Sequence, residues 1–182
     1  METTCTLRPW RPEDAPALAA LLNNRKILDN LRDGIPYPYT VADAEAFLAD
    51  TAAADPTQTF AFAIAAGDVL LGSIGAFRCA NVHSRSAELG YYLGEPWWGR
   101  GYATCAVRQL CRHLWAHTDL LRVFAEPFAY NTASCRVLEK AGFQLEGTLR
   151  SHAVKNGRVL DMRLYACLRP QPEGAAAADA EL

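Results

Sequence analysis

The feature that most constrains this chain is a short turn between a β-rich stretch and a helix-like stretch. Residues 86–94 read SAELGYYLG, which predicts a strand, and residues 101–118 carry apolar side chains at helical spacing. Gly99 and Gly101 stand between them, on either side of Arg100. Glycine lets a backbone approach a ligand closely, and the free amides at a helix N-terminus favour an anion. The turn therefore indicates an anion-binding site, with a tight packed turn as the alternative.

Two common phosphate-binding motifs do not fit this turn. A Walker A loop requires Gly-Lys followed by Ser or Thr, whereas the chain has Arg100-Gly101-Tyr102. A Rossmann fingerprint requires a third glycine where Thr104 stands. A nucleotide phosphate-binding protein of either kind is therefore disfavoured.

The composition excludes several other classes of protein. A chain of 182 residues with 51% hydrophobic and 21% charged residues suits one globular domain. The formal net charge is -2 without a basic block, so we expect no nucleic-acid partner. Charges interrupt every apolar stretch, so we expect no membrane span. The first residues lack the basic segment followed by an apolar one that marks a secretory signal, so we expect no such signal. We expect a cytoplasmic protein.

The six cysteines are scattered and form no metal-binding pattern. No two of them make a CxxC pair, and none has a histidine at the spacing of zinc ligands. The sequence therefore predicts no metal site, and reduced, mostly buried thiols.

The order of the predicted elements indicates an α/β fold. The elements are, in sequence, a strand at 7–10, a helix at 11–27, a loop at 30–39, a helix after Thr40, strands at 59–66, 68–80 and 86–94, a helix at 101–118, a strand at 121–128, a helix at 131–142 and a hairpin at 143–168 that turns at Asn156-Gly157. This order predicts a mixed sheet with helices on both faces, in one domain over residues 7–169. Residues 1–6 are expected to be an N-terminal extension and 170–182 a disordered tail.

Residues 131–147 read NTASCRVLEKAGFQLEG. This stretch resembles the block Asn-x-x-Ser…Glu-Lys-x-Gly-Phe…Glu-Gly of the GNAT superfamily of N-acetyltransferases. Residues 98–103 resemble the acetyl-CoA loop Gln/Arg-x-x-Gly-x-Gly/Ala, although Trp98 replaces the usual Gln or Arg. AELGY at 87–91 matches the preceding strand, and 31–48 resemble the substrate side of the ribosomal-protein alanine/serine N-acetyltransferases. The resemblance covers nearly all of the chain from Leu7 to Leu168.

The resemblance implies a fold and a co-substrate. The sheet would be mixed but mostly antiparallel, and splayed between the strand of Glu88 and the strand at 122–128. Acetyl-CoA would lie in this gap, with its pantetheine arm on exposed backbone and its pyrophosphate on the glycine turn. The residues implied to bind it are Tyr91, Tyr92, Leu93, Trp98, Gly99, Arg100, Gly101, Tyr102, Ala103 and Asn131. Two alternatives stay open: a solvated Arg100 side chain, and a helix N-cap at Asn131.

Direct attack by a primary amine on acetyl-CoA requires a base and an acid. Glu88 is the candidate base, because a carboxylate in an otherwise apolar strand is costly without a task. The alternative is a cross-strand ion pair with Arg78 or Arg85. Ser134 matches the serine proposed as proton donor in the ribosomal-protein subgroup, with a helix-surface hydroxyl as the alternative. Leu138 stands where many relatives carry a tyrosine acid, which excludes that acid here.

The acceptor amine is expected over residues 30–39 and the final hairpin. The candidate substrate-binding residues are Asp33, Tyr37, Tyr39 and Tyr165, with His152 beside them. The acceptor would be a peptide or protein N-terminal α-amine, or a small-molecule amine. Ala153 stands near the position of a carboxylate found in some ribosomal-protein enzymes, which weakens the case for a ribosomal substrate. A catalytically silent acyl-CoA-binding domain is the alternative function, and a homodimer stays open.

Overall fold

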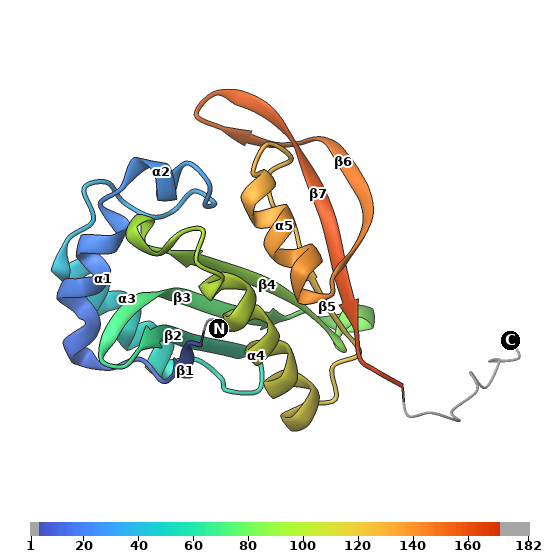
Figure 1. Ribbon diagram of the computed structural model, residues 1–182, viewed down its shortest axis with the longest axis horizontal. Helices are drawn as coiled ribbons and strands as arrows, with labels where there is room; N and C mark the ends of the chain where they lie inside the picture. The colour runs from blue at the N-terminus through green and yellow to red at the C-terminus, as the bar shows by residue number, and fades with distance from the viewer. Residues whose placement is uncertain (1–3, 172–182) are drawn as a thin grey trace, which may run out of the picture.

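Seven strands form one sheet in the order β1-β2-β3-β4-β5-β7-β6 (Figure 1). The computed structural model describes residues 4–171. The strands are β1 Thr6–Arg8, β2 Thr59–Ala66, β3 Val69–Arg78, β4 Ser86–Leu93, β5 Arg122–Ala125, β6 Gln144–Lys155 and β7 Arg158–Leu168. The helices are α1 Ala15–Leu22, α2 Arg25–Leu28, α3 Val41–Ala53, α4 Tyr102–His117 and α5 Thr132–Ala141, and single 3-10 turns span Pro12–Asp14, Asn81–His83 and Glu95–Trp97. The predicted mixed sheet is confirmed.

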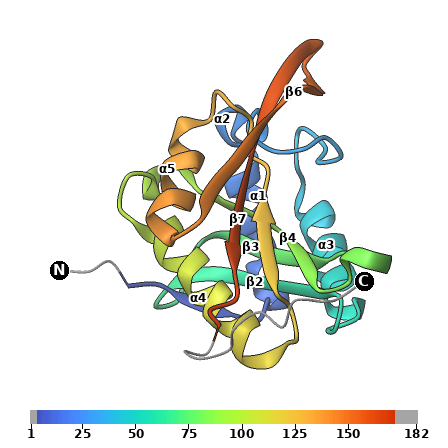
Figure 2. The same ribbon diagram turned by 90° about the vertical axis from the view of Figure 1, so that its right-hand side faces the viewer.

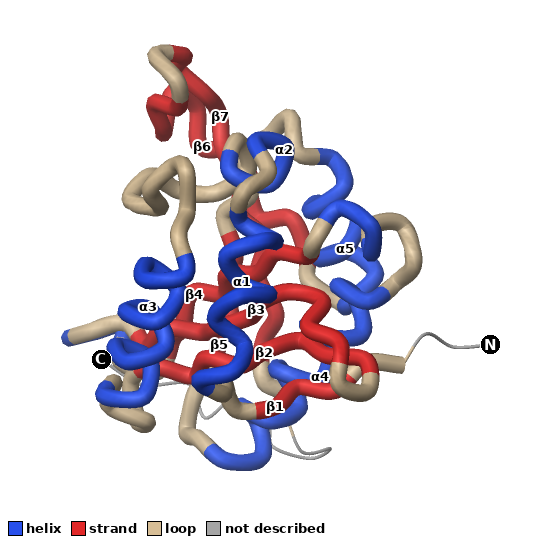
Figure 3. Tube along the Cα trace, turned by 90° about the vertical axis from the view of Figure 1, so that its left-hand side faces the viewer, coloured by secondary structure: helices blue, strands red, loops and turns tan. Residues whose placement is uncertain are grey.

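Helices cover both faces of the sheet, as predicted. Apolar residues of α4 and α5 pack on one face, where Val107, Leu110 and Leu114 are fully buried. A second cluster joins α1, α2 and α3 to the opposite face, around Leu18 and Ala44 (Figure 3). The described part of the chain contains no helix that is long and apolar enough to cross a membrane.

The sheet opens between β4 and β5, which are its only parallel neighbours in the described range 4–171. Their pairing is limited to Ser86–Glu88 against Arg122–Phe124, although β4 continues to Leu93. The ladder of β5 stops before Pro127, which has no amide to donate. From this short pairing the two halves of the sheet diverge in Figure 1. The expected splay is therefore present.

Two predicted segments differ in detail. The helix expected at 11–27 is divided, because Asn24 has extended backbone and its side chain accepts a hydrogen bond from the Lys26 amide, which starts α2 as a new helix. The strand expected at 7–10 is β1, which begins at Thr6 and ends before Pro9. The expected tail at 170–182 lies mostly outside the described residues.

The six cysteines are free thiols, but only Cys111 and Cys135 are buried. The expectation that most of them are buried is wrong, because the other four lie at element ends or on helix sides that the core covers only in part.

A buried ion pair fixes β1 to the turn before α1. The guanidinium of Arg8 donates two hydrogen bonds of 2.7 Å to Asp14, and the Arg11 amide donates a third of 2.9 Å. Both side chains are nearly inaccessible, at 11% and 7%. These donors hold the pKa of Asp14 below its ordinary value, chiefly through the Arg8 hydrogen bonds.

Replacing this aspartate is expected to destabilise the fold in a pH-dependent way. Asp14→Asn should cost about 3 kcal/mol at pH 7, because it leaves the Arg8 charge buried and uncompensated. For a chain of this size that corresponds to a Tm lower by roughly 6–12 °C. A lowered folded-state pKa means that the stabilisation is full above pH ~4 and is lost as the pH falls through that pKa. Thermal melts should therefore show a constant Tm gap from about pH 5 to 8 and a shrinking gap below it. Asp50→Asn, at an exposed position of α3, is the control, and an equal loss there would contradict the assignment.

Candidate active site

The glycine turn places free amides at the start of α4. Gly99 and Gly101 have φ values of +72° and +86°, in the left-handed region that favours glycine. Gly101 is the N-cap of α4 and provides no side-chain cap to the first helical amides. These amides, from Tyr102 and Ala103 onward, are therefore open to an anion at the positive end of the helix dipole.

The open edge of β4 exposes backbone groups from alternate residues only. The Gly94 amide donates to the Leu71 carbonyl at 2.8 Å, which makes Leu93 a non-hydrogen-bonded position of the β3–β4 ladder. The backbone groups of Leu93 and of Tyr91, two residues earlier, therefore point away from β3 into the splay. Those of Tyr92 point into the ladder instead. The prediction that Tyr92 offers backbone to a ligand is thus wrong, whereas the backbone groups of Tyr91 and Leu93 face the splay.

Trp98 closes the junction between the strand and the turn. Its indole Nε1 donates a hydrogen bond of 2.8 Å to the carbonyl of Leu93. The Leu93 carbonyl is therefore occupied, and only the Leu93 amide can hydrogen-bond a ligand. Arg100 lies over the ring of Trp97, with 5.5 Å from its guanidinium carbon to the ring centroid. The two tryptophans thus shape the turn between β4 and α4.

A pair of hydroxyls spans the splay from β4 to α5. The Tyr91 and Ser134 hydroxyl oxygens are 2.8 Å apart, and the Tyr91 hydroxyl also donates to the Ser134 carbonyl at 3.2 Å. Asn131 caps α5 by accepting a hydrogen bond of 3.1 Å from the Ser134 amide, so its N-cap role is confirmed. Burial raises the pKa of Tyr91 well above its ordinary value, which keeps this hydroxyl protonated at neutral pH.

Glu88 lies beside the splay, but its partner is not the expected one. Arg78 and Arg85 both pair with Asp119. The Glu88 carboxylate instead accepts hydrogen bonds from both terminal nitrogens of Arg32, which lies in the loop after α2. The bond from Nη1 to Oε2 is 3.3 Å long. The alternative that Glu88 pairs with Arg78 or Arg85 is therefore wrong, because both guanidinium groups bind Asp119 instead.

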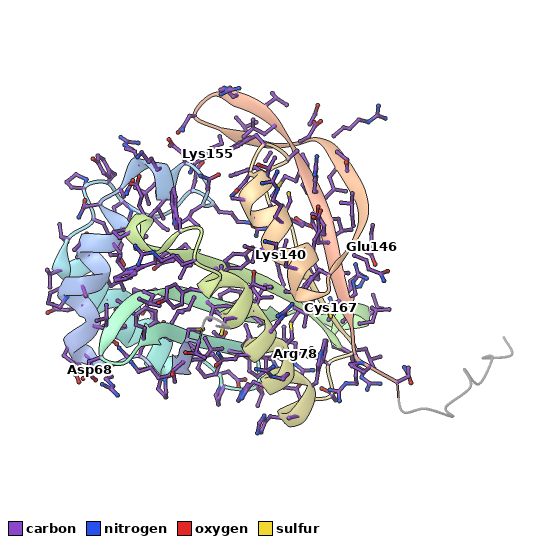
Figure 4. The ribbon with its side chains drawn as sticks, in the orientation of Figure 1. Asp68, Arg78, Lys140, Glu146, Lys155 and Cys167 are labelled. Carbon is purple, nitrogen blue, oxygen red and sulfur yellow. The ribbon has the colours of Figure 1, made fainter. Side chains whose placement is uncertain are left out.

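A pocket of about 350 Å³ is lined in part by Arg32, the arginine that binds Glu88. It is formed by the loop after α2, the end of β5 and the β6–β7 hairpin, which projects beyond the rest of the sheet (Figure 2). Lys155, near the hairpin tip, reaches back towards that loop (Figure 4) and contacts Asp33 at 2.6 Å. The charged and titratable side chains in its lining are Arg32, Asp33, Glu126, His152 and Lys155.

Of the predicted substrate-binding residues, only Asp33 and His152 line this pocket. Tyr39 is only 6% exposed in the core under α3, where its amide binds the Asn23 side chain. Tyr165 is fully buried, and its hydroxyl donates to Glu139 at 2.7 Å. Tyr37 is exposed but stacks under Arg25 and is outside the pocket lining. The substrate-binding predictions for Tyr39 and Tyr165 are therefore wrong, because both side chains are buried, whereas that for Tyr37 stays a prediction.

Arg32 and Glu126 are site residues that the sequence analysis missed. The signal for Glu126 was available, because it is a carboxylate at the end of the apolar run RVFAEPF, like Glu88 in its own strand. Arg32 had no such signal, because it reaches Glu88 across 56 positions of sequence. Among residues 4–171, no group of His, Cys, Asp and Glu side chains is arranged to hold a metal ion.

Comparison with known proteins identifies the family. Residues 5–144 match the family model described as acetyltransferase (GNAT) domain. The chain belongs to this family. A Bacillus licheniformis relative, an uncharacterised N-acetyltransferase, is 27% identical over 93% of this chain and 95% of its own. A ribosomal-protein-serine acetyltransferase of Escherichia coli is 32% identical over 58% of this chain and 58% of its own.

The GNAT fold is also found in solved structures. The structure of the ribosomal alpha-N-protein acetyltransferase RimL in complex with coenzyme A has a TM-score of 0.81 at 23% identity, over 92% of this chain and 95% of that one. This likeness shows a shared fold. As a member of the GNAT family, the chain is an N-acetyltransferase whose acetyl donor is acetyl-CoA.

Proposed function

We propose that this GNAT enzyme acetylates a primary amine, either a peptide N-terminal α-amine or a small-molecule amine, by direct attack in a ternary complex. One observation carries the proposal: β4 has Glu88, whose partner Arg32 lines the pocket, then open backbone at Tyr91 and Leu93, and the glycine turn after its end. The three features lie in one line along the splay. Acetyl-CoA fits this line, with its diphosphate at Gly99–Ala103 and its thioester near Tyr91.

The chemistry follows from the order of these groups. An amine with a pKa near ~10 is protonated at neutral pH and must lose a proton before it can attack. In this proposal Glu88 accepts that proton, directly or through water. Backbone amides on the open edge of β4 would polarise the thioester carbonyl. Ser134, in contact with the buried Tyr91 hydroxyl, would donate a proton to the departing CoA thiolate.

The type of acceptor is supported by the pocket and by the relatives. An open pocket of about 350 Å³ admits the end of a chain or a small amine. The Escherichia coli relative is a ribosomal-protein-serine acetyltransferase, which favours a peptide α-amine. A cytoplasmic location fits the six free thiols.

The proposal is tested by chromatographic detection of CoA released from acetyl-CoA. The acceptor panel contains short peptides with free N-terminal serine or alanine, their N-acetylated forms as controls, and small primary amines. Release with the free peptides or amines, and not with the blocked peptides, supports the proposal. Binding of acetyl-CoA without release for any acceptor would instead identify a silent acyl-CoA-binding domain.

Removing the hydroxyl on α5 tests the proton donor. Ser134→Ala is expected to lower kcat by about 100-fold or more, because general acid catalysis contributes roughly 10²- to 10⁴-fold. The KM for acetyl-CoA should change little, since the diphosphate contacts are intact. Thr132→Ala removes an exposed hydroxyl from the same helical turn and is the control. Equal kcat values for the two variants would show that Ser134 is not the acid.

A further inference from the structure

The side chains of Glu88 and Glu126 lie on the same face of the sheet. In β4 the neighbours of Glu88, Ala87 and Leu89, are buried in the cluster under α4 and α5. Ala125, just before Glu126, is buried in the same cluster. Because side chains alternate along an extended chain, both glutamates point to the opposite face, across the start of the splay.

One guanidinium contacts both carboxylates. Nη2 of Arg32 pairs with Oε1 of Glu88 and lies 3.6 Å from Oε2 of Glu126. The two glutamate side chains are only 28% and 19% exposed, whereas that of Arg32 is 64% exposed. Two partly buried acids, one in β4 and one just after β5, are therefore paired with a cation that approaches from solvent on a loop.

The loop that carries this cation is held mainly at its ends. The Asp29 carbonyl accepts a hydrogen bond of 2.6 Å from the Tyr130 hydroxyl, and Asp33 binds Lys155 at 2.6 Å. Arg32 lies between these two attachments, and its side chain also lines the pocket. Its guanidinium can therefore leave the two glutamates by a change of rotamer while the loop backbone stays attached.

We propose that Glu88 and Glu126 form a binding site for the ammonium group of the acceptor, and that Arg32 occupies this site until an acceptor displaces it. The inference rests on the proposed function, in which Glu88 receives a proton from the acceptor amine. An organic ammonium matches the charge and the N–H donors of the guanidinium that fills the site. Displacement lowers the apparent affinity for the acceptor, because only the fraction of molecules with Arg32 moved away can bind.

The test uses a simple probe, n-butylammonium. An NMR titration measures its affinity for the CoA-loaded protein. Arg32→Gln should tighten binding about fivefold, the effect of removing one competing ion pair. Glu126→Gln should weaken binding by a similar factor. Arg122→Gln is the control and should leave binding unchanged. It breaks a similar pair, in which Arg122 binds Glu146 of β6 at 2.7 Å, on the side of β5 that faces away from β4. Arg32→Lys, which keeps a cation, should stay close to the wild type.

Kinetics give a second readout once an acceptor is known. Arg32→Gln should lower the acceptor KM about fivefold and leave kcat within about twofold, a split that a purely structural role would not produce. Weaker or unchanged butylammonium binding in Arg32→Gln, no effect of Glu126→Gln, or no binding by any variant would overturn the proposal. The binding arm needs no turnover. Butylammonium binding as expected without any acetyl transfer would therefore refute the proposed function and leave the ammonium site standing.

Discussion

Glu88→Gln is expected to lower kcat/KM for the acceptor by roughly 10²- to 10⁴-fold, the range typical of a lost general base. The amide keeps the shape of the side chain but cannot accept a proton from the amine. The affinity for acetyl-CoA should be unchanged, since the glycine turn and the open backbone of Tyr91 and Leu93 are untouched. CoA release measured by chromatography, together with acetyl-CoA binding measured by calorimetry, separates these two effects. Chromatography is preferable to a thiol-reactive dye, because the protein has six free cysteines.

Glu146→Gln is the matched control for this change. Glu146 is also a glutamate paired with an arginine, Arg122, but it lies at the opposite end of β6 from Lys155 (Figure 4). Its loss removes the same charge and the same kind of ion pair away from the splay. If both variants kept near wild-type turnover, the role of Glu88 as base would be refuted.

Gly101→Asp is expected to weaken acetyl-CoA binding by about 100-fold or more. The new carboxylate would stand at the N-cap of α4, where the bound diphosphate is placed, and adjacent like charges cost several kcal/mol. A non-glycine residue at φ +86° adds a folding cost of about 1–2 kcal/mol. Calorimetric titration with acetyl-CoA measures the first effect and a thermal melt the second.

Gly142→Asp separates strain from charge repulsion. Gly142 ends α5 at φ +99°, and a Cβ there would meet no atom within 4 Å. The control therefore carries the same substitution and a similar backbone cost, away from the turn. Equal acetyl-CoA affinity in the two variants would mean that the diphosphate does not lie at the start of α4.

The backbone part of the site could be predicted from the sequence because its signals are local. Gly99 and Gly101 mark positive φ within a few residues of the helix that they cap. The alternation of buried and exposed residues in β4, and the Asn131 cap of α5, are similarly short-range patterns. The order of strands and helices then allowed few strand orders for the sheet, because connections between elements are short and have a fixed handedness. These are the features that the structure reproduces.

The side-chain part could not be predicted in this way, because it depends on contacts between distant segments. Tyr39 and Tyr165 were expected at the acceptor pocket from their position in the chain, yet both are in the core. An aromatic hydroxyl can face solvent or be satisfied internally, and the sequence does not say which. Arg32 is bound to Glu88 only because the loop after α2 folds over the end of β5. A strand pattern carries no information about such a loop.

The outward-facing peptide groups of β4 have a consequence for how this enzyme can diverge. In the proposed complex, main-chain groups of β4 hold acetyl-CoA, and every residue type except proline supplies both an amide and a carbonyl. Substitution at Leu93 would then be limited by packing in the core rather than by chemistry. In the same proposal, the acceptor is recognised by individual side chains on the loop after α2 and on the β6–β7 hairpin. A descendant could therefore acquire a new amine by changing a few surface positions while inheriting the donor half intact.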